Sequence, residues 1–67
     1  MVLIITRTKG KSIMIYPEDI SEDVTVAELF ADGPIEISVV ETRSHQCKLG
    51  ITAPSELVIL REEIYQG

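Results

Sequence analysis

His45 and Cys47 are the two side chains of this sequence that could form a nucleophilic pair, because histidine can activate a cysteine thiol. They are two residues apart, so in a strand both would point the same way. Such a pair also needs an orienting third group and an electropositive pocket. Cys47 instead follows the apolar alternation of Leu49 and Ile51. We therefore interpret Cys47 as a core cysteine and His45 as a turn residue.

Glu62 and Glu63 are the other candidates for catalysis, as a pair of carboxylates. Adjacent residues of a helix do not face each other, and acids in a first helical turn are explained by the helix dipole. One cysteine and one histidine leave a structural zinc site short of ligands. No glycine-rich phosphate-binding loop is present. The sequence predicts a protein that is not an enzyme, with no metal and no cofactor.

Basic side chains raise a different possibility, which is recognition. Arg61 follows four apolar residues in LVILREEIYQG, residues 57–67. It could be an ordinary rim arginine paired with Glu62, Glu63 or Glu56, and such exposed pairs are weak. The run RTKGK at residues 7–11 could likewise be a solvated hairpin that protects a sheet edge. Neither feature identifies a function by itself.

The length of the chain limits how these residues can be held. A chain of 67 residues can form one small domain, which buries only about 60% of the surface that its unfolded form exposes. A single cysteine excludes an intrachain disulfide, so self-association is the expected source of stability. No segment resembles a signal peptide or a membrane span, and the unpaired thiol favours a cytoplasmic location. We expect a homodimer that does not contact a membrane.

The net charge of −5 is unevenly distributed. Residues 16–34 contain no lysine or arginine and six of the eleven acids. The six acids are Glu18, Asp19, Glu22, Asp23, Glu28 and Asp32. The chain is therefore expected to be a nearly neutral body that carries an acidic insertion.

Apolar alternation predicts a mainly β chain with five strands. The strands are expected near residues 3–9, 12–16, 35–39, 47–51 and 57–60. In the third strand, Ile35, Ile37 and Val39 alternate with polar residues and predict one buried face. Pro54 lies in the turn before the fifth strand, because proline is costly inside a central strand.

The insertion contains the clearest helix signal. Thr25 suits the N-cap, and Glu28 three residues later completes a capping box. Gly33 can adopt the left-handed conformation that ends a helix, and Pro34 prevents continuation. We predict a helix over residues 26–32 that packs on the sheet, and a second short helix at the C-terminus.

Two stretches of the sequence are LIITRTKGKSIMI at residues 3–15 and residues 35–66, which end in CKLGITAPSELVILREEIYQ. Together they resemble the carbon storage regulator (CsrA/RsmA) family of small bacterial RNA-binding translational regulators. The most specific parts of this resemblance are LxxTR, LGITAP and REEIYQ. Order and spacing agree when residues 16–34 are set aside as an insertion, and some divergent members carry a helix at that position. The resemblance implies one CsrA-like domain over residues 1–67.

The resemblance also implies a site and a partner. Family members form intertwined homodimers in which the first strand of one chain lies beside the fifth strand of the other. Each edge binds a GGA-containing element in an mRNA leader, often hiding the ribosome-binding site, and small decoy RNAs compete for the protein. The implied RNA-binding residues are Arg61, Arg7, Ile5, Thr6, Thr8, Ala53, Pro54 and Leu60. Arg61 of one chain and Arg7 of the other would flank one site, with both arginines exposed.

Three features of the sequence keep a second function open. Thr8 stands where the family commonly has a second basic residue, and Leu60 where histidine is frequent. The insertion adds six negative charges. The alternative is an acidic paralogue that acts through protein–protein interaction and binds RNA weakly.

Overall fold

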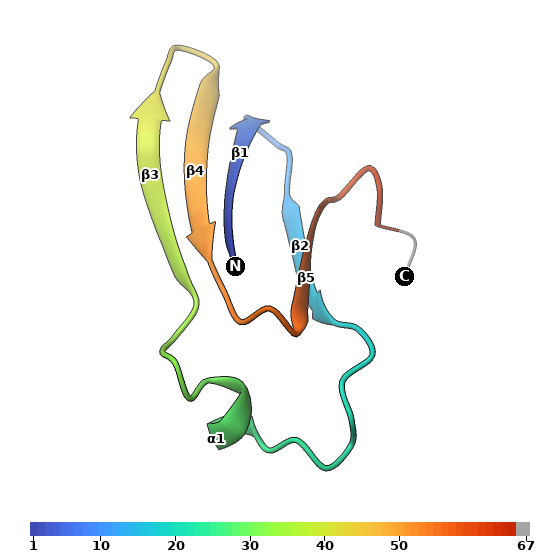
Figure 1. Ribbon diagram of the computed structural model, residues 1–67. Coiled ribbons are helices and arrows are strands. Elements are labelled where there is room, and N and C mark those ends of the chain that lie inside the picture. Colours follow the sequence, from blue (N-terminus) through green and yellow to red (C-terminus); the bar gives the residue numbers. More distant parts are fainter. Residues whose placement is uncertain (66–67) are drawn as a thin grey trace.

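The computed structural model describes residues 1–65 and contains five strands and one very short helix (Figure 1). The mainly β prediction is therefore confirmed. No helix among these residues has the length and apolar character needed to cross a membrane. In chain order the elements are β1 (Val2–Thr8), β2 (Ile13–Pro17), α1 (Val26–Leu29), β3 (Glu36–Thr42), β4 (Gln46–Thr52) and β5 (Leu57–Arg61).

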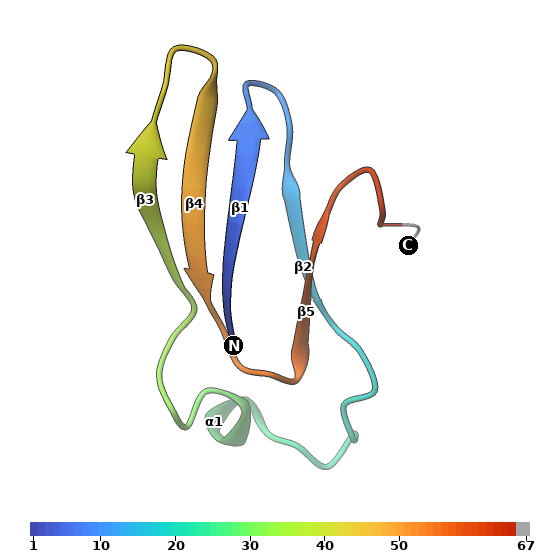
Figure 2. The same ribbon diagram turned by 45° about the horizontal axis from the view of Figure 1, so that its top comes forward.

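The strands form two antiparallel sheets, which lie side by side in Figures 1 and 2. One sheet has the order β1-β4-β3, and the other consists of β2 and β5. In the first sheet Ile5 lies opposite Leu49, and Ile37 lies opposite Ile51. In the second, Ile15 lies opposite Ile59. The apolar residues of the alternating strands are thus brought to common faces.

A small core joins the two sheets. Ile5, Ile51, Ala53 and Ile59 are buried in one cluster, and Ile51 has no exposed surface. Four partly buried side chains pack against this cluster, namely Leu3, Ile13, Ile15 and Ile35. The core is therefore built from β1, β4 and β5 and from the loop that follows β4.

The predicted burial of the third strand is not found within one chain. Every residue of β3 is exposed, including Ile37 and Val39. β3 is an edge strand, and β2 and β5 lie on the β1 side of the larger sheet, away from it (Figures 1 and 2). A bulge between Val39 and Glu41 lets the strand continue to Thr42. Of the three apolar residues expected to be buried, Ile35 lies just before β3 and packs partly against the core, but nothing in residues 1–65 covers Ile37 and Val39.

The inserted helix begins as predicted and ends early. The Thr25 hydroxyl accepts a hydrogen bond from the Glu28 amide at 3.1 Å, which confirms the N-cap. The prediction of residues 26–32 is wrong at its end, because α1 stops at Leu29. Beyond it, Ala31 N–H donates to Glu28 O and Gly33 N–H donates to Phe30 O. These bonds span three residues rather than four and so tighten the chain into turns. Gly33 has the predicted positive φ, +126°.

The helix also does not pack on a sheet. Leu29 lines a groove with Thr52 at the end of β4 and with residues 53–56 of the loop between β4 and β5. The helix α1 lies beyond the ends of the strands (Figure 1).

The predicted C-terminal helix is absent from the described part of the chain. After β5, the N–H groups of Ile64 and Tyr65 both donate to Arg61 O, which forms a turn. The Glu62 and Glu63 side chains bind the β1–β2 turn and Arg7 respectively, so the segment is fixed against the sheets instead of extending as a helix. The last part of this prediction, residues 66–67, lies outside the described residues.

Candidate nucleic-acid interface

Two strand edges are open at the places where the sequence predicts a binding site. β1 pairs only with β4, and β5 pairs only with β2, within residues 1–65. Each strand therefore has one edge whose backbone N–H and C=O groups have no strand partner in a single chain. Such edges can add another strand or hydrogen-bond the edges of unstacked bases.

Arg61 ends one of these strands and is available for a ligand. It is exposed and lies opposite Ile13 at the end of β5. Its guanidinium forms no ion pair with any described residue. The three acids proposed as partners are engaged elsewhere in the chain. Glu63 binds Arg7, Glu62 accepts from Ser12 N–H, and Glu56 accepts from the Ser55 hydroxyl.

Arg7 is held very differently, although the sequence predicted it to be exposed. It is buried, with 8% of its surface exposed. Its Nη1 and Nη2 atoms donate to the two carboxylate oxygens of Glu63 at 2.8 and 3.0 Å. Further bonds go to Ser12 O at 2.9 Å and Thr6 O at 3.2 Å. Arg7 faces inward because its position on β1 shares the phase of buried Ile5. In one chain it therefore fastens the C-terminal segment to the β1–β2 turn.

This contact also changes the acid–base properties of the pair. The hydrogen bond from Arg7 lowers the pKa of Glu63 to about 2, and the same bond raises the pKa of Arg7. Both groups stay charged across the physiological pH range. A ligand that needs Arg7 must compete with a bidentate carboxylate.

The other predicted site residues fall into two groups. Ile5, Thr6 and Thr8 lie along β1, where Ile5 is buried, Thr6 is half-buried and Thr8 is exposed. Leu60 is half-buried and precedes Arg61. Ala53 and Pro54 lie in the β4–β5 loop, at the opposite end of β5 from Arg61. Within one chain, the structure thus brings Arg7 and Thr8 to the same end as Arg61 but leaves the Ala53–Pro54 loop at the other end.

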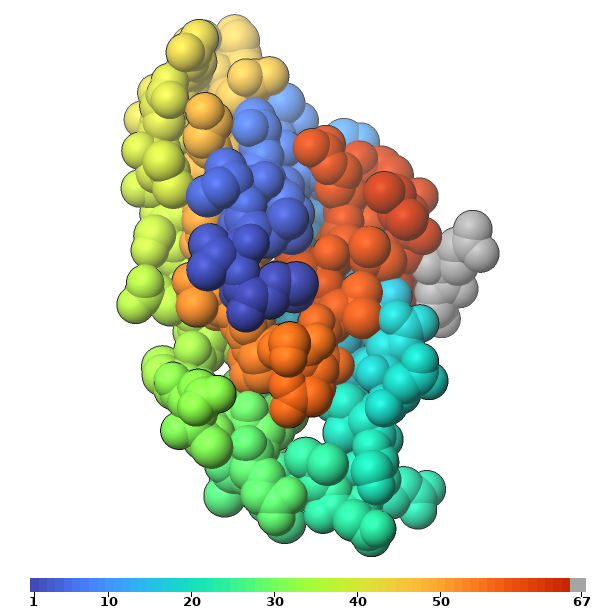
Figure 3. Space-filling view, viewed as in Figure 1, coloured from blue at the N-terminus to red at the C-terminus, as the bar shows by residue number. Residues whose placement is uncertain are grey.

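That loop borders a groove with an acidic lining. A cavity of about 240 Å³ lies between residues 52–56 and the insertion. Figure 3 shows the hollow between this loop and the green insertion. Glu28, Asp32 and Glu56 line it, and no lysine or arginine of the described part of the chain does. Ala53 is also buried, with 4% exposed. The loop predicted to close over RNA therefore faces negative charge in this protein.

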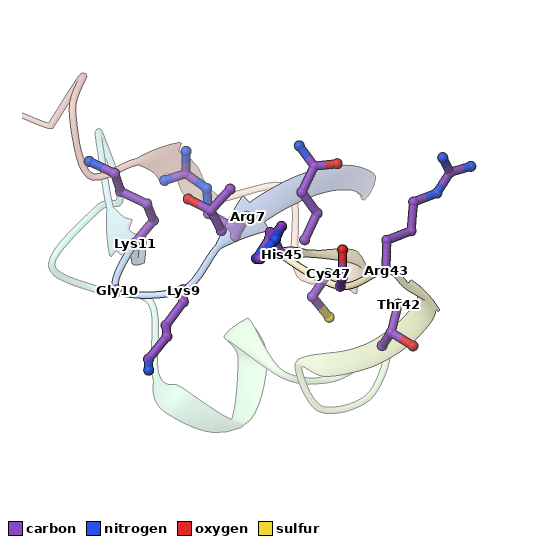
Figure 4. Close-up of a pocket in the computed structure, with 11 residues that line it drawn as sticks. Arg7, Lys9, Gly10, Lys11, Thr42, Arg43, His45 and Cys47 are labelled. Atoms are coloured by element: carbon purple, nitrogen blue, oxygen red, sulfur yellow. The ribbon is translucent and has the colours of Figure 1, made fainter.

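A larger cavity lies at the other end of the strands, and it was not predicted. It has a volume of about 640 Å³, is open to solvent, and lies between the β1–β2 turn and the β3–β4 turn. We call it the basic cavity (Figure 4). Its lining residues are Arg7, Thr8, Lys9, Gly10, Lys11, Thr42, Arg43, Ser44, His45, Gln46 and Cys47.

The basic cavity also corrects the interpretation of Cys47 as a core cysteine, whereas His45 lies in the turn between β3 and β4 as predicted. Cys47 is half-buried and lines this cavity beside His45 rather than joining the core cluster. No group of three or more His, Cys, Asp or Glu suited to a metal ion occurs within residues 1–65. The basic run RTKGK, which forms one side of the cavity, could be recognised in the sequence. That residues 42–46 form the other side could not, because only the fold brings the two turns together.

Comparison with known proteins agrees with this architecture. Residues 2–67 match the CsrA family, described as a global regulator protein family. The translational regulator CsrA of Clostridium botulinum (strain Alaska E43 / Type E3) is 38% identical over 66 residues, which cover 98% of this chain and 70% of that protein. The five-stranded β architecture and these matches together show that the chain belongs to the CsrA family of global regulator proteins.

Proposed function

We propose that this protein is an RNA-binding translational regulator that recognises GGA-containing elements in mRNA leaders or small RNAs. The observation that carries the proposal is the exposed Arg61 guanidinium, which has no acidic partner among residues 1–65 and ends an open-edged strand. The name of the Clostridium botulinum relative, a translational regulator, supports the same class of function.

The chemistry of the site follows from its parts. A planar guanidinium can bind a phosphate or a guanine edge through two parallel hydrogen bonds, which lysine cannot reproduce. The backbone groups of an open strand can bond the Watson–Crick edges of splayed bases. An occupied GGA element at a ribosome-binding site would block translation without any reaction catalysed by the protein.

The proposal includes a homodimer. The three-stranded sheet has an open edge at β1, and the two-stranded sheet has an open edge at β5. Exchange of strands between two chains would pair these edges. β5 of one chain beside β1 of the other would give two five-stranded sheets. It would also place Arg61 of one chain near Arg7 and Thr8 of its partner. The exposed apolar side chains of Val2, Ile4, Ile37 and Val39 supply surface that a second copy could cover.

Titration of a GGA hairpin RNA against the Arg61→Ala variant tests the function. Loss of a charged recognition contact costs about 2 kcal/mol or more, so affinity should fall about 30-fold or more. Lys48→Ala is the matched control, because it removes one positive charge that is already 3.7 Å from Glu41. A hairpin without GGA provides the RNA control. Unchanged binding by Arg61→Ala would show that this arginine does not read RNA.

The dimer has a separate test. Its unfolding midpoint should rise with protein concentration, since folding and association are linked. A folded monomer seen by sedimentation at micromolar concentration would contradict the strand exchange.

The acidic lining of the groove beside Ala53 and Pro54 favours one alternative, in which the protein acts mainly through a protein partner. The same titration separates the two functions. Weak binding of GGA and control hairpins alike by the parent protein would favour the alternative.

A further inference from the structure

The basic cavity contains two lysines, Lys9 and Lys11, to which the proposed recognition of GGA assigns no role. Lys9 and Lys11 are exposed and form no ion pair with the described residues. In Figure 4 their side chains extend to different sides of the turn at Gly10, while His45 faces the turn from the other hairpin. Among residues 1–65, no aspartate or glutamate lines the cavity.

The remaining two cations of the cavity are already paired. Arg7 binds Glu63, and Arg43 binds Glu41 at 2.8 Å. Figure 4 shows Arg43 extending away from the turn of residues 9–11. Lys11 is near enough to Glu63 to contribute to its lowered pKa, but it makes no direct contact with it. The free charge of the cavity is therefore carried by the two lysines.

The position of the cavity points to a particular ligand. Arg61 lies opposite Ile13, and Arg7 bonds Ser12, so both arginines lie next to the turn that forms one wall. At the far end of β5, the groove beside Ala53 is lined by three carboxylates. A phosphate backbone that leaves the strand edge is attracted toward the first end and repelled from the second.

We propose that the basic cavity is a phosphate-binding subsite, which holds the backbone of the RNA segment that flanks the recognised element. The inference rests on the proposed RNA-binding function. Lysine suits this task because its ammonium group is a flexible point charge that contacts phosphate without reading sequence. The subsite extends the footprint on RNA and adds affinity that depends on the length of the ligand.

Two hairpin RNAs and one double variant test the subsite. One RNA contains the GGA loop on the shortest stem that stays closed, and the other has the stem lengthened by several base pairs. The variant is Lys9→Gln/Lys11→Gln. We expect it to weaken binding of the long RNA by about three- to tenfold, with the slope of log affinity against log salt reduced by about one per lysine. Because it removes two charges, its effect on the short RNA should not exceed about twice that of Lys48→Gln, which removes one.

The single variants Lys11→Gln and Lys48→Gln form a matched pair, because each removes one charge from the same end of the molecule and Lys48 lies outside the cavity. A larger loss for Lys11→Gln with the long RNA supports the subsite. Equal losses would mean that only overall charge matters, and would overturn it. A loss that is the same for both RNAs would also overturn it, because the lysines would then belong to the recognition of the loop itself.

Two further measurements separate the possible failures. If Arg61→Ala binds both RNAs like the parent, the proposed function fails. If Arg61→Ala loses binding of both RNAs while the lysine variant loses neither, only the subsite fails.

Inorganic tripolyphosphate is titrated alone to detect a small-anion site. Its binding without any gain from the longer stem would overturn the assignment to RNA. Unfolding curves of the variants should match that of the parent, because both lysines are exposed.

Discussion

The two ends of the strands have opposite chemistry. Residues 6–13, 41–48 and 61–65 form a basic end, which holds all six lysines and arginines and only three acids. Residues 17–36 and 52–57 form an acidic end, which holds the other eight acids and no lysine or arginine. The net charge of −5 is thus an average over two ends that would treat a polyanion in opposite ways.

The ends also differ in how they are held. At the basic end, Arg7 and Glu62 tie the β1–β2 turn to the segment after β5. At the acidic end, the insertion has a helix of four residues with none buried. The basic end is therefore braced by side chains, while the insertion at the acidic end depends mainly on local turns and one helix cap.

The largest effect on stability is expected from a change in the core that lies between the two ends, because both ends depend on it. Ile51→Ala removes the side chain that is fully buried in the cluster of both sheets. The loss of buried surface and the cavity left behind should lower the free energy of unfolding by about 2–5 kcal/mol. Urea unfolding at fixed protein concentration measures it. Val26→Ala, at a helix position that is 73% exposed, is the control and should cost under about 0.5 kcal/mol.

The next test removes the brace at the basic end. Glu63→Gln should destabilise the protein at pH 7, because Arg7 would remain buried opposite an uncharged side chain. The pKa of Glu63 is lowered from 4.5 to about 2 in the folded state, so its stabilisation is present above about pH 4.5 and is lost as the pH falls toward 2. The difference between parent and variant, measured by thermal unfolding, should shrink over that range. Glu22→Gln is the control, and a pH dependence equal to that of Glu63→Gln would contradict the role of the pair.

The acidic end can be neutralised without touching its helix cap. Changing Glu18, Asp19, Glu22 and Asp23 to their amides removes four charges and leaves Thr25 and Glu28 intact. Asp19 has a φ of +56°, which asparagine also tolerates. Four unit charges that each lie about one Debye length from an RNA phosphate oppose binding by under about 1 kcal/mol together. RNA binding should therefore tighten by about three- to fourfold at physiological salt when they are removed.

The gain in RNA affinity of this variant should depend on the salt concentration. The gain should be larger at low salt and disappear at high salt, because screening weakens repulsion at a distance. Affinity that is unchanged at every ionic strength would show that the insertion does not oppose RNA electrostatically.

The smallest effect concerns the cap itself. Thr25→Ala removes the oxygen that accepts from the Glu28 amide, at a cost of about 0.5–1 kcal/mol to the helix. Hydrogen exchange at Glu28 should accelerate, while amides of β4 keep their protection. Thr25→Ser retains the hydroxyl and serves as the matched control. Loss of protection in β4 would show that the acidic end supports the sheets more than its contacts suggest.

Local signals predicted the parts of the fold that local chemistry decides. The five strands, the Thr25 cap and the positive φ of Gly33 follow from alternation, capping and turn preferences. Interactions between distant segments decided the rest. The exposure of β3 depends on which strands the second sheet covers. The turn at residues 62–64 depends on the bond between Glu63 and the distant Arg7.

The candidate site shows the same limit. The acidic end is nearly all one continuous segment, so it is visible in the sequence. The basic end is assembled from three segments, and only the antiparallel pairing brings residues 9–11 beside residues 43–46. The burial of Arg7 was also missed, because alternation along β1 gives its phase but not the carboxylate that neutralises it.

The open edges of β1 and β5 have a consequence for gene dosage. Under the proposed strand exchange, neither sheet is complete until two chains meet, so newly made protein becomes active by a bimolecular step. When chains are scarce, the amount of active regulator rises with the square of their number. A twofold change in synthesis would then change the repressing species about fourfold. The amount of active dimer would therefore be very low when the chain is weakly expressed. It would rise more steeply than the amount of chain as the messenger of this protein becomes abundant.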